Sequence, residues 1–250
     1  MLKTPFMRLA SLVPFVALAS LAACGGSEDA SDDDAADTSE ELGAVLAGAD
    51  TNGSTMDLAA ARARGASFVG RYLSFDGAHP ALSAAEVARF RAGGMPLFAI
   101  WETGQKRTIE LGSEKAEHAA GVMDATYAKQ ALVQVGAAGK PVYFTVDFDV
   151  TPAIWTQKGH LVLAYFEGVN SVIGVARTGA YGTYATIKGL FDAGKIRYGW
   201  QQTFGGRGAK TDKRAQLRQF DIYPDPTGWG VSGAGALDLD RAVAADFGQF

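Results

Sequence analysis

The chain has 250 residues, of which 48% are hydrophobic and 20% charged, and its formal net charge is −4. This length allows one large domain or two small ones with a substantial apolar core. The single cysteine excludes an intramolecular disulfide and any zinc or iron–sulfur site built from several thiolates. The three histidines, His79, His118 and His160, lack metal-ligand spacing, so we expect no metal and no cofactor. The mild acidity argues against a nucleic-acid partner.

Residues 1–23 have the pattern of an export signal. Lys3 and Arg8 give a basic start, and the apolar run over residues 9–23 ends in small side chains. About fifteen residues are fewer than the roughly 20 that cross a bilayer as a helix, so we expect no transmembrane anchor. The run ends in Leu21-Ala22-Ala23-Cys24, which resembles a bacterial lipobox, and the alternative is ordinary signal cleavage beside an incidental cysteine. Because Cys24 is the only cysteine, we predict that it is lipidated and anchors an exported protein at the outer membrane or cell surface.

An acidic segment follows the predicted signal. Residues 25–41 carry eight acidic side chains, no basic one and no large apolar one. Such a stretch cannot offset its ordering entropy, which predicts a disordered tether over residues 24–43. A metal-binding acidic run is the alternative. Residues 42–250 hold 19 acidic and 21 basic side chains, so the predicted folded part is close to neutral.

From residue 44 onward, short apolar runs alternate with helix-like stretches. Ser83 followed by Glu86 is typical of a capping box and predicts a helix start. Residues 141–146 form the near-continuous apolar run of a buried parallel strand. In chain order, the predicted elements are strand 44–49, helix 56–64, strand 67–73, helix 83–92, strand 95–101, helix 113–135, strand 141–146, helix 154–172, strand 174–181, helix 185–193, strands 196–203, 215–220 and 235–239, and a last helix 241–247.

The order of these elements predicts the fold class. Strands that alternate with helices, without tight hairpins, indicate a parallel sheet with helices outside. Eight strands with helices after only the first five predict an α/β fold of the TIM-barrel-like type, a modified (β/α)5β3 barrel that forms a single domain over residues 44–250. The length fits the roughly 200 to 400 residues of such barrels. A doubly wound open sheet is the alternative, but no phosphate-binding glycine fingerprint follows the first strand.

Acidic residues end four of the predicted strands. They are Asp50, Glu102, Asp147, Asp149 and Asp238. In a parallel barrel these ends meet at the face where active sites lie. Alternation along a strand directs both Asp147 and Asp149 inward. Acids so crowded cannot all ionise easily, so at least one should have a raised pKa, as a general acid near neutral pH requires. A helix cap or a loop salt bridge would explain any one of them alone.

Aromatic and polar side chains gather at the same strand ends. Flat aromatic faces beside carboxylates suit a pyranose ring, whose hydroxyl groups bond to the acids. A place in the barrel core is the alternative for Trp101 and Trp200. Arg71 could neutralise part of the acid cluster or hold an anionic substituent. The predicted substrate-binding residues are Arg71, Tyr72, Trp101, Tyr181, Trp200 and Gln202.

An ordered set of short motifs covers residues 44–250. They are Gly48-Ala49-Asp50, Phe68-Val69-Gly70-Arg71-Tyr72, Val142-Tyr143-Phe144-Thr145-Val146-Asp147-Phe148-Asp149, Gly179-Ala180-Tyr181-Gly182, Tyr198-Gly199-Trp200-Gln201-Gln202 and Leu237-Asp238-Leu239-Asp240. Together they resemble the DUF1906, or Rv2525c-like, glycoside-hydrolase-like domain, which is related to the family 25 lysozymes, muramidases that cleave peptidoglycan. The resemblance implies a modified barrel of five βα units and three closing strands.

The resemblance also implies roles for the acids. In the lysozymes the fourth strand ends in Asp-x-Glu, and the Glu is the general acid. By position, Asp149 takes the place of that acid, Asp147 is the neighbouring carboxylate, and Asp50 and Asp238 complete the site. Asp is one methylene shorter than Glu, which withdraws the carboxyl group by about 1.5 Å and can cost on the order of 10²-fold in rate. Glu102 is then the alternative proton donor.

Two functions of different classes follow. The first is a lipoprotein that hydrolyses glycosidic bonds of peptidoglycan or another envelope glycan by carboxylate acid catalysis. The second is a catalytically inactive protein that binds an envelope glycan in the same acidic cleft. A divalent-metal site in the acid cluster ranks third, because no histidine joins it. We expect a monomer, with the envelope glycan as its partner and a membrane contact through Cys24.

Overall fold

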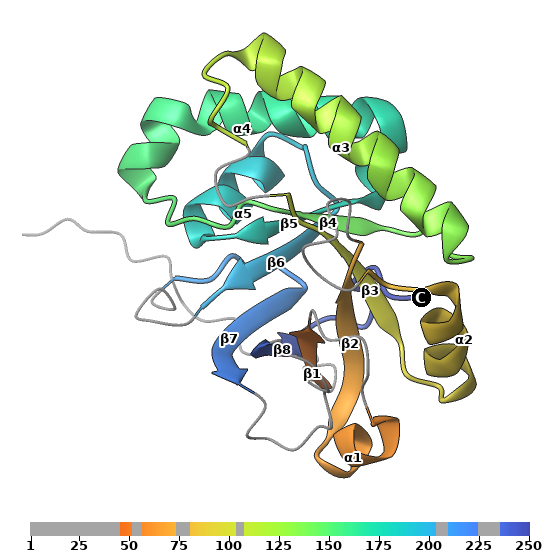
Figure 1. Ribbon diagram of the computed structural model, residues 1–250. Helices are drawn as coiled ribbons and strands as arrows, with labels where there is room; N and C mark the ends of the chain where they lie inside the picture. The colour runs from red at the N-terminus through yellow and green to blue at the C-terminus, as the bar shows by residue number, and fades with distance from the viewer. Residues whose placement is uncertain (1–45, 52–56, 74–80, 104–107, 204–209, 225–235) are drawn as a thin grey trace, which may run out of the picture. The chain divides into compact units, whose positions relative to one another are not determined.

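The computed structural model describes residues 46–51, 57–73, 81–103, 108–203, 210–224 and 236–250, all within the unit Glu41–Phe250 (Figure 1). The predicted signal, the tether and Cys24 lie outside the described residues. The elements are β1 (Leu46–Thr51), α1 (Leu58–Ala63), β2 (Ala66–Tyr72), α2 (Ala84–Ala92), β3 (Leu97–Trp101), α3 (Glu114–Gln134), β4 (Val142–Thr145), α4 (Pro152–Ile173), the 3-10 turn η1 (Val175–Arg177), β5 (Thr178–Gly182), α5 (Tyr184–Asp192), β6 (Tyr198–Gln202), β7 (Leu217–Pro224) and β8 (Ala236–Ala242).

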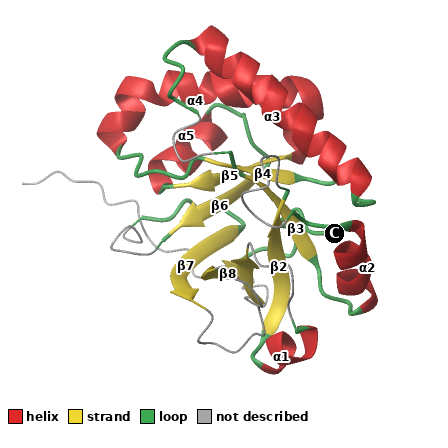
Figure 2. Cartoon of the chain, viewed as in Figure 1, coloured by secondary structure: helices red, strands yellow, loops and turns green. Residues whose placement is uncertain are grey.

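The eight strands close into a barrel in their sequence order. The neighbouring strands from β1 to β7 are parallel, and each of the first five is followed by a helix, as Figure 2 shows. This confirms the predicted (β/α)5β3 barrel. The prediction that Asp238 ends a strand running with the others was wrong, because β8 runs antiparallel to both β7 and β1. Asp238 near the start of β8 therefore pairs with Asp50 near the end of β1, so both lie at the carboxyl rim of the parallel strands.

Alternation along the strands separates two apolar layers. Inward positions from several strands form a cluster of buried rings inside the barrel, including Phe68, Phe98, Tyr143 and Trp200. Outward positions, such as Val69, pack with the helices in a second, larger cluster. The period of two in a strand produces this division, because successive side chains point to opposite faces.

The C-terminal segment closes the amino-terminal end of the barrel. The predicted helix over residues 241–247 is wrong, because Arg241 and Ala242 continue β8 and pair with both neighbouring strands. Phe247 is 1% exposed and its ring lies 4.8 Å from that of Phe68. The free energy of burying this ring outweighs that of a helix of two turns, which is only marginally stable alone.

Helix boundaries follow the capping residues that the sequence predicts. Ser83 Oγ accepts a hydrogen bond from Glu86 N at 3.1 Å, and Ser113 Oγ caps α3 in the same way. The predicted strand over residues 174–181 begins only at Thr178, because Gly174, at φ +79°, ends α4 and leads into the 3-10 turn. Among the helices of the described residues, none is long and apolar enough to cross a membrane.

Candidate functional site

A cavity of about 210 Å³ opens at the carboxyl rim of the parallel strands. All but one of the eight strands contribute a lining residue, either within the strand or within two residues after its end. The lining residues are Tyr72, Glu102, Thr145, Asp147, Tyr181, Trp200, Gln219 and Asp238. Three carboxyl groups and three aromatic rings therefore surround one small space, as the strand-end pattern predicted.

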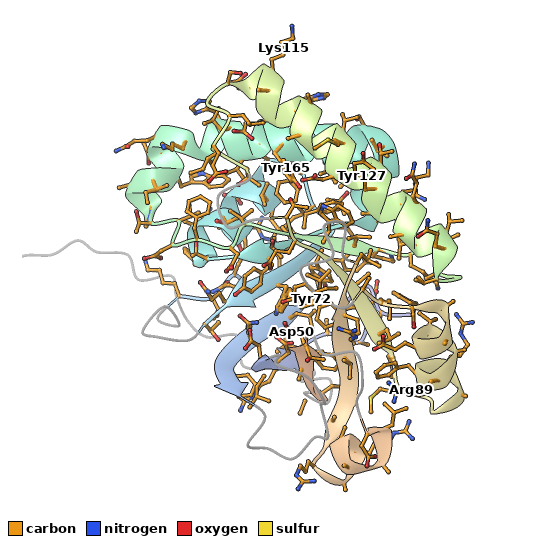
Figure 3. All side chains as sticks on the ribbon, viewed as in Figure 1. Asp50, Tyr72, Arg89, Lys115, Tyr127 and Tyr165 are labelled. Carbon is orange, nitrogen blue, oxygen red and sulfur yellow. The ribbon has the colours of Figure 1, made fainter. Side chains whose placement is uncertain are left out.

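Gln219 connects the acids at the base of this cavity. Its Nε2 donates to Asp50 Oδ2 at 2.9 Å and to Asp238 Oδ2 at 3.1 Å. Its Oε1 accepts from Tyr181 Oη at 2.5 Å, which fixes the orientation of the amide. Asp50 also accepts from Tyr72 Oη at 2.9 Å, and Figure 3 labels both residues, which come from adjacent strands. One amide thus holds two carboxyl groups in a defined geometry.

The buried acids have raised pKa values. Burial raises the pKa of Asp50 to about 6, and the charge of Glu102 adds a smaller increase, while hydrogen bonds from Gln219 and Tyr72 oppose it. Burial, followed by the charge of Asp50, raises the pKa of Asp240 well above its ordinary range. The sequence predicted that crowding would raise at least one pKa, and here removal from water is the larger cause.

The two tyrosines of the cavity stay protonated and act as donors. Burial and then the charge of Asp50 raise the pKa of Tyr72 well above its ordinary value. Burial and then the charge of Asp147 raise the pKa of Tyr181. Gln202 Nε2 donates to Tyr181 Oη at 3.1 Å, so the phenol is itself held in place. Gln202 therefore lies behind the cavity wall and supports Tyr181.

Asp149 does not share this cavity, contrary to the predicted inward position. Its side chain is exposed, because β4 ends at Thr145 and the alternation ends with it. Hydrogen bonds from Val150 N to Phe148 O and from Thr151 N to Asp149 O mark a turn in this segment. Asp147, which directly precedes that turn, lines the cavity.

Arg71 faces the helices and not the acid cluster. Phe68, Gly70 and Tyr72 take the inward positions of β2, so Arg71 points outward and is fully buried. Its Nε lies 2.6 Å from Glu86 Oε1, and Nη1 donates to the carbonyl of Thr51. This ion pair uses the Glu86 carboxylate expected in the capping box. The predicted contact of Arg71 with the acids or with a substrate anion is therefore wrong.

Trp101 also belongs to the layer between barrel and helices. It is 1% exposed and packs with outward residues such as Leu97 and Ala99, while Phe98 and Ile100 point into the barrel. Trp101 is therefore a core residue, which was the alternative to a role in substrate binding. Trp200 is in the cavity wall, with its ring centroid 4.4 Å from that of Tyr181, and is at the same time nearly fully buried.

Three residues of the site were not among the predicted ones. Gln219 and Thr145 line the cavity, and Asp240 lies buried beside Asp50. The alternation Leu237-Asp238-Leu239-Asp240 carried a signal for Asp240, since residues two apart in a strand share a face. Gln219 has the same relation to Leu217, which points into the barrel. In the part of the chain that the structure describes, no group of three His, Cys, Asp or Glu side chains could hold a metal ion.

Comparison with known proteins places this geometry in context. The model of the Rv2525c-like, glycoside hydrolase-like domain matches residues 59–242. The putative peptidoglycan hydrolase Rv2525c of Mycobacterium tuberculosis is 26% identical over 167 residues, which are 66% of this chain and 65% of that protein. The match thus spans slightly less than two thirds of that relative.

Solved structures resemble the fold. The M. tuberculosis Tat-secreted protein Rv2525c, in complex with L-tartrate, superposes with a TM-score of 0.68 at 23% identity, over 83% of this chain and 98% of that one. The Clostridium perfringens spore cortex lytic enzyme SleM gives a TM-score of 0.53 at 15% identity, over 81% and 68% of the two chains. Both have the same barrel architecture as the chain described above.

Proposed function

Because this chain belongs to the Rv2525c-like glycoside hydrolase-like domain family, we propose that it hydrolyses glycosidic bonds of a cell-envelope glycan, with peptidoglycan as the first candidate. The observation that carries this proposal is the cavity in which Glu102, Asp147 and Asp238 meet beside Tyr181 and Trp200. A relative described as a putative peptidoglycan hydrolase supports the choice of substrate.

The geometry supports one distribution of roles among the acids. Glu102 is the proton donor, because it lines the cavity and its side chain is one methylene longer than that of an aspartate. It gives its proton to the glycosidic oxygen as the bond from that oxygen to the anomeric carbon breaks. Asp147 is the carboxylate that stabilises the positive charge on the sugar. A water molecule then adds its hydroxyl group to the anomeric carbon and gives its remaining proton to a carboxylate of the site. Asp50 and Asp238, both hydrogen-bonded to Gln219, form the negatively charged floor of the site.

Substrate contacts follow from the same lining. The aromatic wall of Tyr181 and Trp200 packs on the C–H face of a sugar, and Tyr72 offers a phenol beside the acids. A cavity of about 210 Å³ holds one ring-sized group, so the remaining units of a polymer lie outside it.

The proposal is tested with purified peptidoglycan and measurement of released muropeptides by mass spectrometry. We expect Glu102→Gln and Asp147→Asn to lower the rate on the order of 10²-fold or more, since a positioned general acid contributes about that much. Glu167→Gln and Asp192→Asn remove exposed carboxylates from α4 and α5 and serve as matched controls with unchanged rates. Release that persists in both cavity variants would contradict the assigned roles, and absence of any product would contradict the hydrolase.

A second function, glycan binding without cleavage, is favoured by one observation. The position to which the family 25 resemblance assigns the general acid, Asp149, is exposed and outside the cavity. A protein of this kind would bind peptidoglycan, release nothing after prolonged incubation, and keep its affinity in Glu102→Gln and Asp147→Asn. Measuring sedimentation with insoluble peptidoglycan alongside product release separates the two functions.

Export and membrane attachment through Cys24 are part of the proposal. The signal-like residues 1–23 and the lipobox-like Leu21-Ala22-Ala23-Cys24 support them, and the similar protein Rv2525c is described as Tat-secreted. We expect radiolabelled palmitate to be incorporated into the wild-type chain and not into Cys24→Ser, which should leave the detergent phase in Triton X-114 partition. Equal labelling of both chains would show that Cys24 is not the lipid attachment site.

A further inference from the structure

Asp240 lies beside the acids of the cavity but is completely buried. It follows Asp238 by two residues on β8, where it pairs with Gly48 of β1 and Gln219 of β7. Trp200 Nε1 donates to Asp240 Oδ1 at 2.8 Å. Asp50 and Asp240 lie on the paired strands β1 and β8, two residues apart in register, and their buried carboxyl groups interact electrostatically.

The partners of Asp50 show that it accepts hydrogen bonds at both oxygens. Oδ1 accepts from the phenol of Tyr72, and Oδ2 accepts from the amide nitrogen of Gln219. The amide cannot be reversed without loss of its bond from Tyr181, whose hydroxyl donates to Gln219 Oε1. This pattern fits an ionised carboxylate, because a protonated Asp50 would have to donate from an oxygen that already accepts a hydrogen bond.

A hydrogen bond between two carboxyl groups requires a proton on one of them. Since both oxygens of Asp50 accept from other donors, the proton belongs to Asp240. Asp240 Oδ1 already accepts from the indole of Trp200, and among the described residues no N–H or O–H group donates to the buried Oδ2. The proton therefore lies on Oδ2 of Asp240. With this proton, Oδ2 can donate a hydrogen bond to Asp50.

We propose that Asp240 is a positioning residue that stays a neutral carboxylic acid and holds Asp50 as the ionised carboxylate of the site by donating a hydrogen bond to it. The effect on catalysis rests on the proposed hydrolase, whereas the place of the proton does not. Two ionised carboxylates in contact within a protein interior repel each other strongly, so a pair of this kind shares one proton.

The groups around the pair act in the same direction. Asp50 from β1, Asp238 from β8 itself, Tyr143 from β4 and Tyr181 from β5 interact electrostatically with Asp240, and each is acidic. Trp200 from β6 adds only the neutral indole. Burial and the charge of Asp50 both raise the pKa of Asp240. The hydrogen bond with Asp240 in turn lowers the pKa of Asp50, so Asp240 helps to keep Asp50 ionised.

Infrared spectroscopy of the full chain as isolated locates the proton without an activity assay. At pH 8 we expect the carbonyl stretching band of a protonated carboxylic acid, shifted in D₂O, in the wild type and in the exposed-site control Asp246→Asn. The band should be absent from Asp240→Asn. A wild type without such a band, or a band that survives in Asp240→Asn, would overturn the proposal. This result is independent of whether the protein hydrolyses a glycan.

The positioning role is tested by comparing Asp240→Asn with Asp240→Leu. The Asn amide can still donate to Asp50 and accept from Trp200, whereas Leu can do neither. By ¹³C NMR titration we expect the pKa of Asp50 to stay near about 6 in Asp240→Asn and to rise in Asp240→Leu. In the hydrolase assay, Asp240→Asn should retain kcat within about threefold, while Asp240→Leu loses at least tenfold and its acidic limb moves to higher pH. Equal titration of Asp50 in both variants would exclude a positioning hydrogen bond.

Discussion

The two ends of the barrel interior use the same strands but different chemistry. At the amino-terminal end, Phe68, Phe98, Tyr143 and Phe247 pack as rings whose centroids lie 4.8–6.5 Å apart. At the carboxyl end, the inward positions carry carboxyl, amide and phenol groups joined by hydrogen bonds. The amino-terminal end stabilises the fold through burial of apolar area. The carboxyl end holds buried acids, which lower the stability of the fold.

This contrast shows how a small barrel can contain a site whose buried acids lower the stability of the fold. Removal of Asp50 and Asp240 from water is unfavourable for their charged forms, so the polar end depends on the free energy gained at the aromatic end. Substitutions at the two ends should therefore differ in kind. Those at the aromatic end should change stability first, and those at the polar end should change pH dependence and activity first.

The largest loss of stability is expected for Phe98→Ala. The ring of Phe98 is fully buried and makes edge contacts with the rings of Tyr143 and Trp200 at centroid distances of 5.5 Å and 5.2 Å. Its removal should lower the free energy of unfolding in urea by about 3–5 kcal/mol, through lost burial and a residual cavity. Tyr127→Ala, on the half-exposed face of α3, is the control with a change below about 1 kcal/mol. A similar loss of unfolding free energy in both variants would show that the aromatic end does not contribute more to stability than the surface of α3.

The second effect is a change in pH dependence in Asp50→Asn. Below about pH 4 the carboxyl group is protonated in both folded and unfolded chains. Between about pH 4 and pH 6 the unfolded chain loses this proton while the folded chain keeps it, since burial raises the pKa of Asp50 to about 6. The wild type should therefore lose about 3 kcal/mol of unfolding free energy across this window, at about 1.4 kcal/mol per pH unit.

Asparagine does not titrate, so Asp50→Asn should lack this decline. Its unfolding free energy relative to wild type should rise with pH and level off above about pH 6, as measured by urea denaturation at several pH values. Asp246→Asn, which removes an exposed carboxyl group, should keep the wild-type slope. Parallel curves for Asp50→Asn and wild type would show that Asp50 is not a source of the decline.

An intermediate effect is expected for Gly70→Ala, which links the two ends. A Cβ at this position would lie 2.7 Å from Cβ of Asp50 and closer still to the ring of Phe98. The ring must move, which should cost about 1–3 kcal/mol of unfolding free energy. The double variant with Phe98→Leu provides space and should recover part of this loss. No recovery in the double variant would mean that the strain does not come from the ring.

The smallest effect is expected for Asp149→Asn. Its exposed carboxyl group lies outside the polar end of the barrel, so stability should change by less than about 0.5 kcal/mol. Muropeptide release should stay within about twofold of wild type, in contrast to Asp147→Asn two residues away. A loss equal to that of Asp147→Asn would return Asp149 to the role of general acid that the family resemblance assigns to it.

Several features could be predicted because they depend on local chemistry. Ser83 and Ser113 cap helices through a hydrogen bond three residues along the chain, and the run over residues 141–146 is apolar enough to be a buried strand. The acids Asp50, Glu102 and Asp147 come to one rim because the parallel strands of a barrel all end there. Asp238 joins them from near the start of the reversed β8. The predicted inward position of Asp149 was wrong, because β4 ends at Thr145 and the chain turns over residues 148–151.

By itself, the amino-acid sequence determined the order of the elements, the modified barrel and the rim at which its acids gather, since periodicity and caps act over a few residues. Only the tertiary structure decided that β8 is reversed, that Arg71 faces Glu86, and that Gln219 and Asp240 join the acids. These features depend on partners far apart in the chain, because hydrogen bonds and desolvation are set by which groups share a buried space. The fold thus follows from local pattern, whereas the protonation of its site follows from packing.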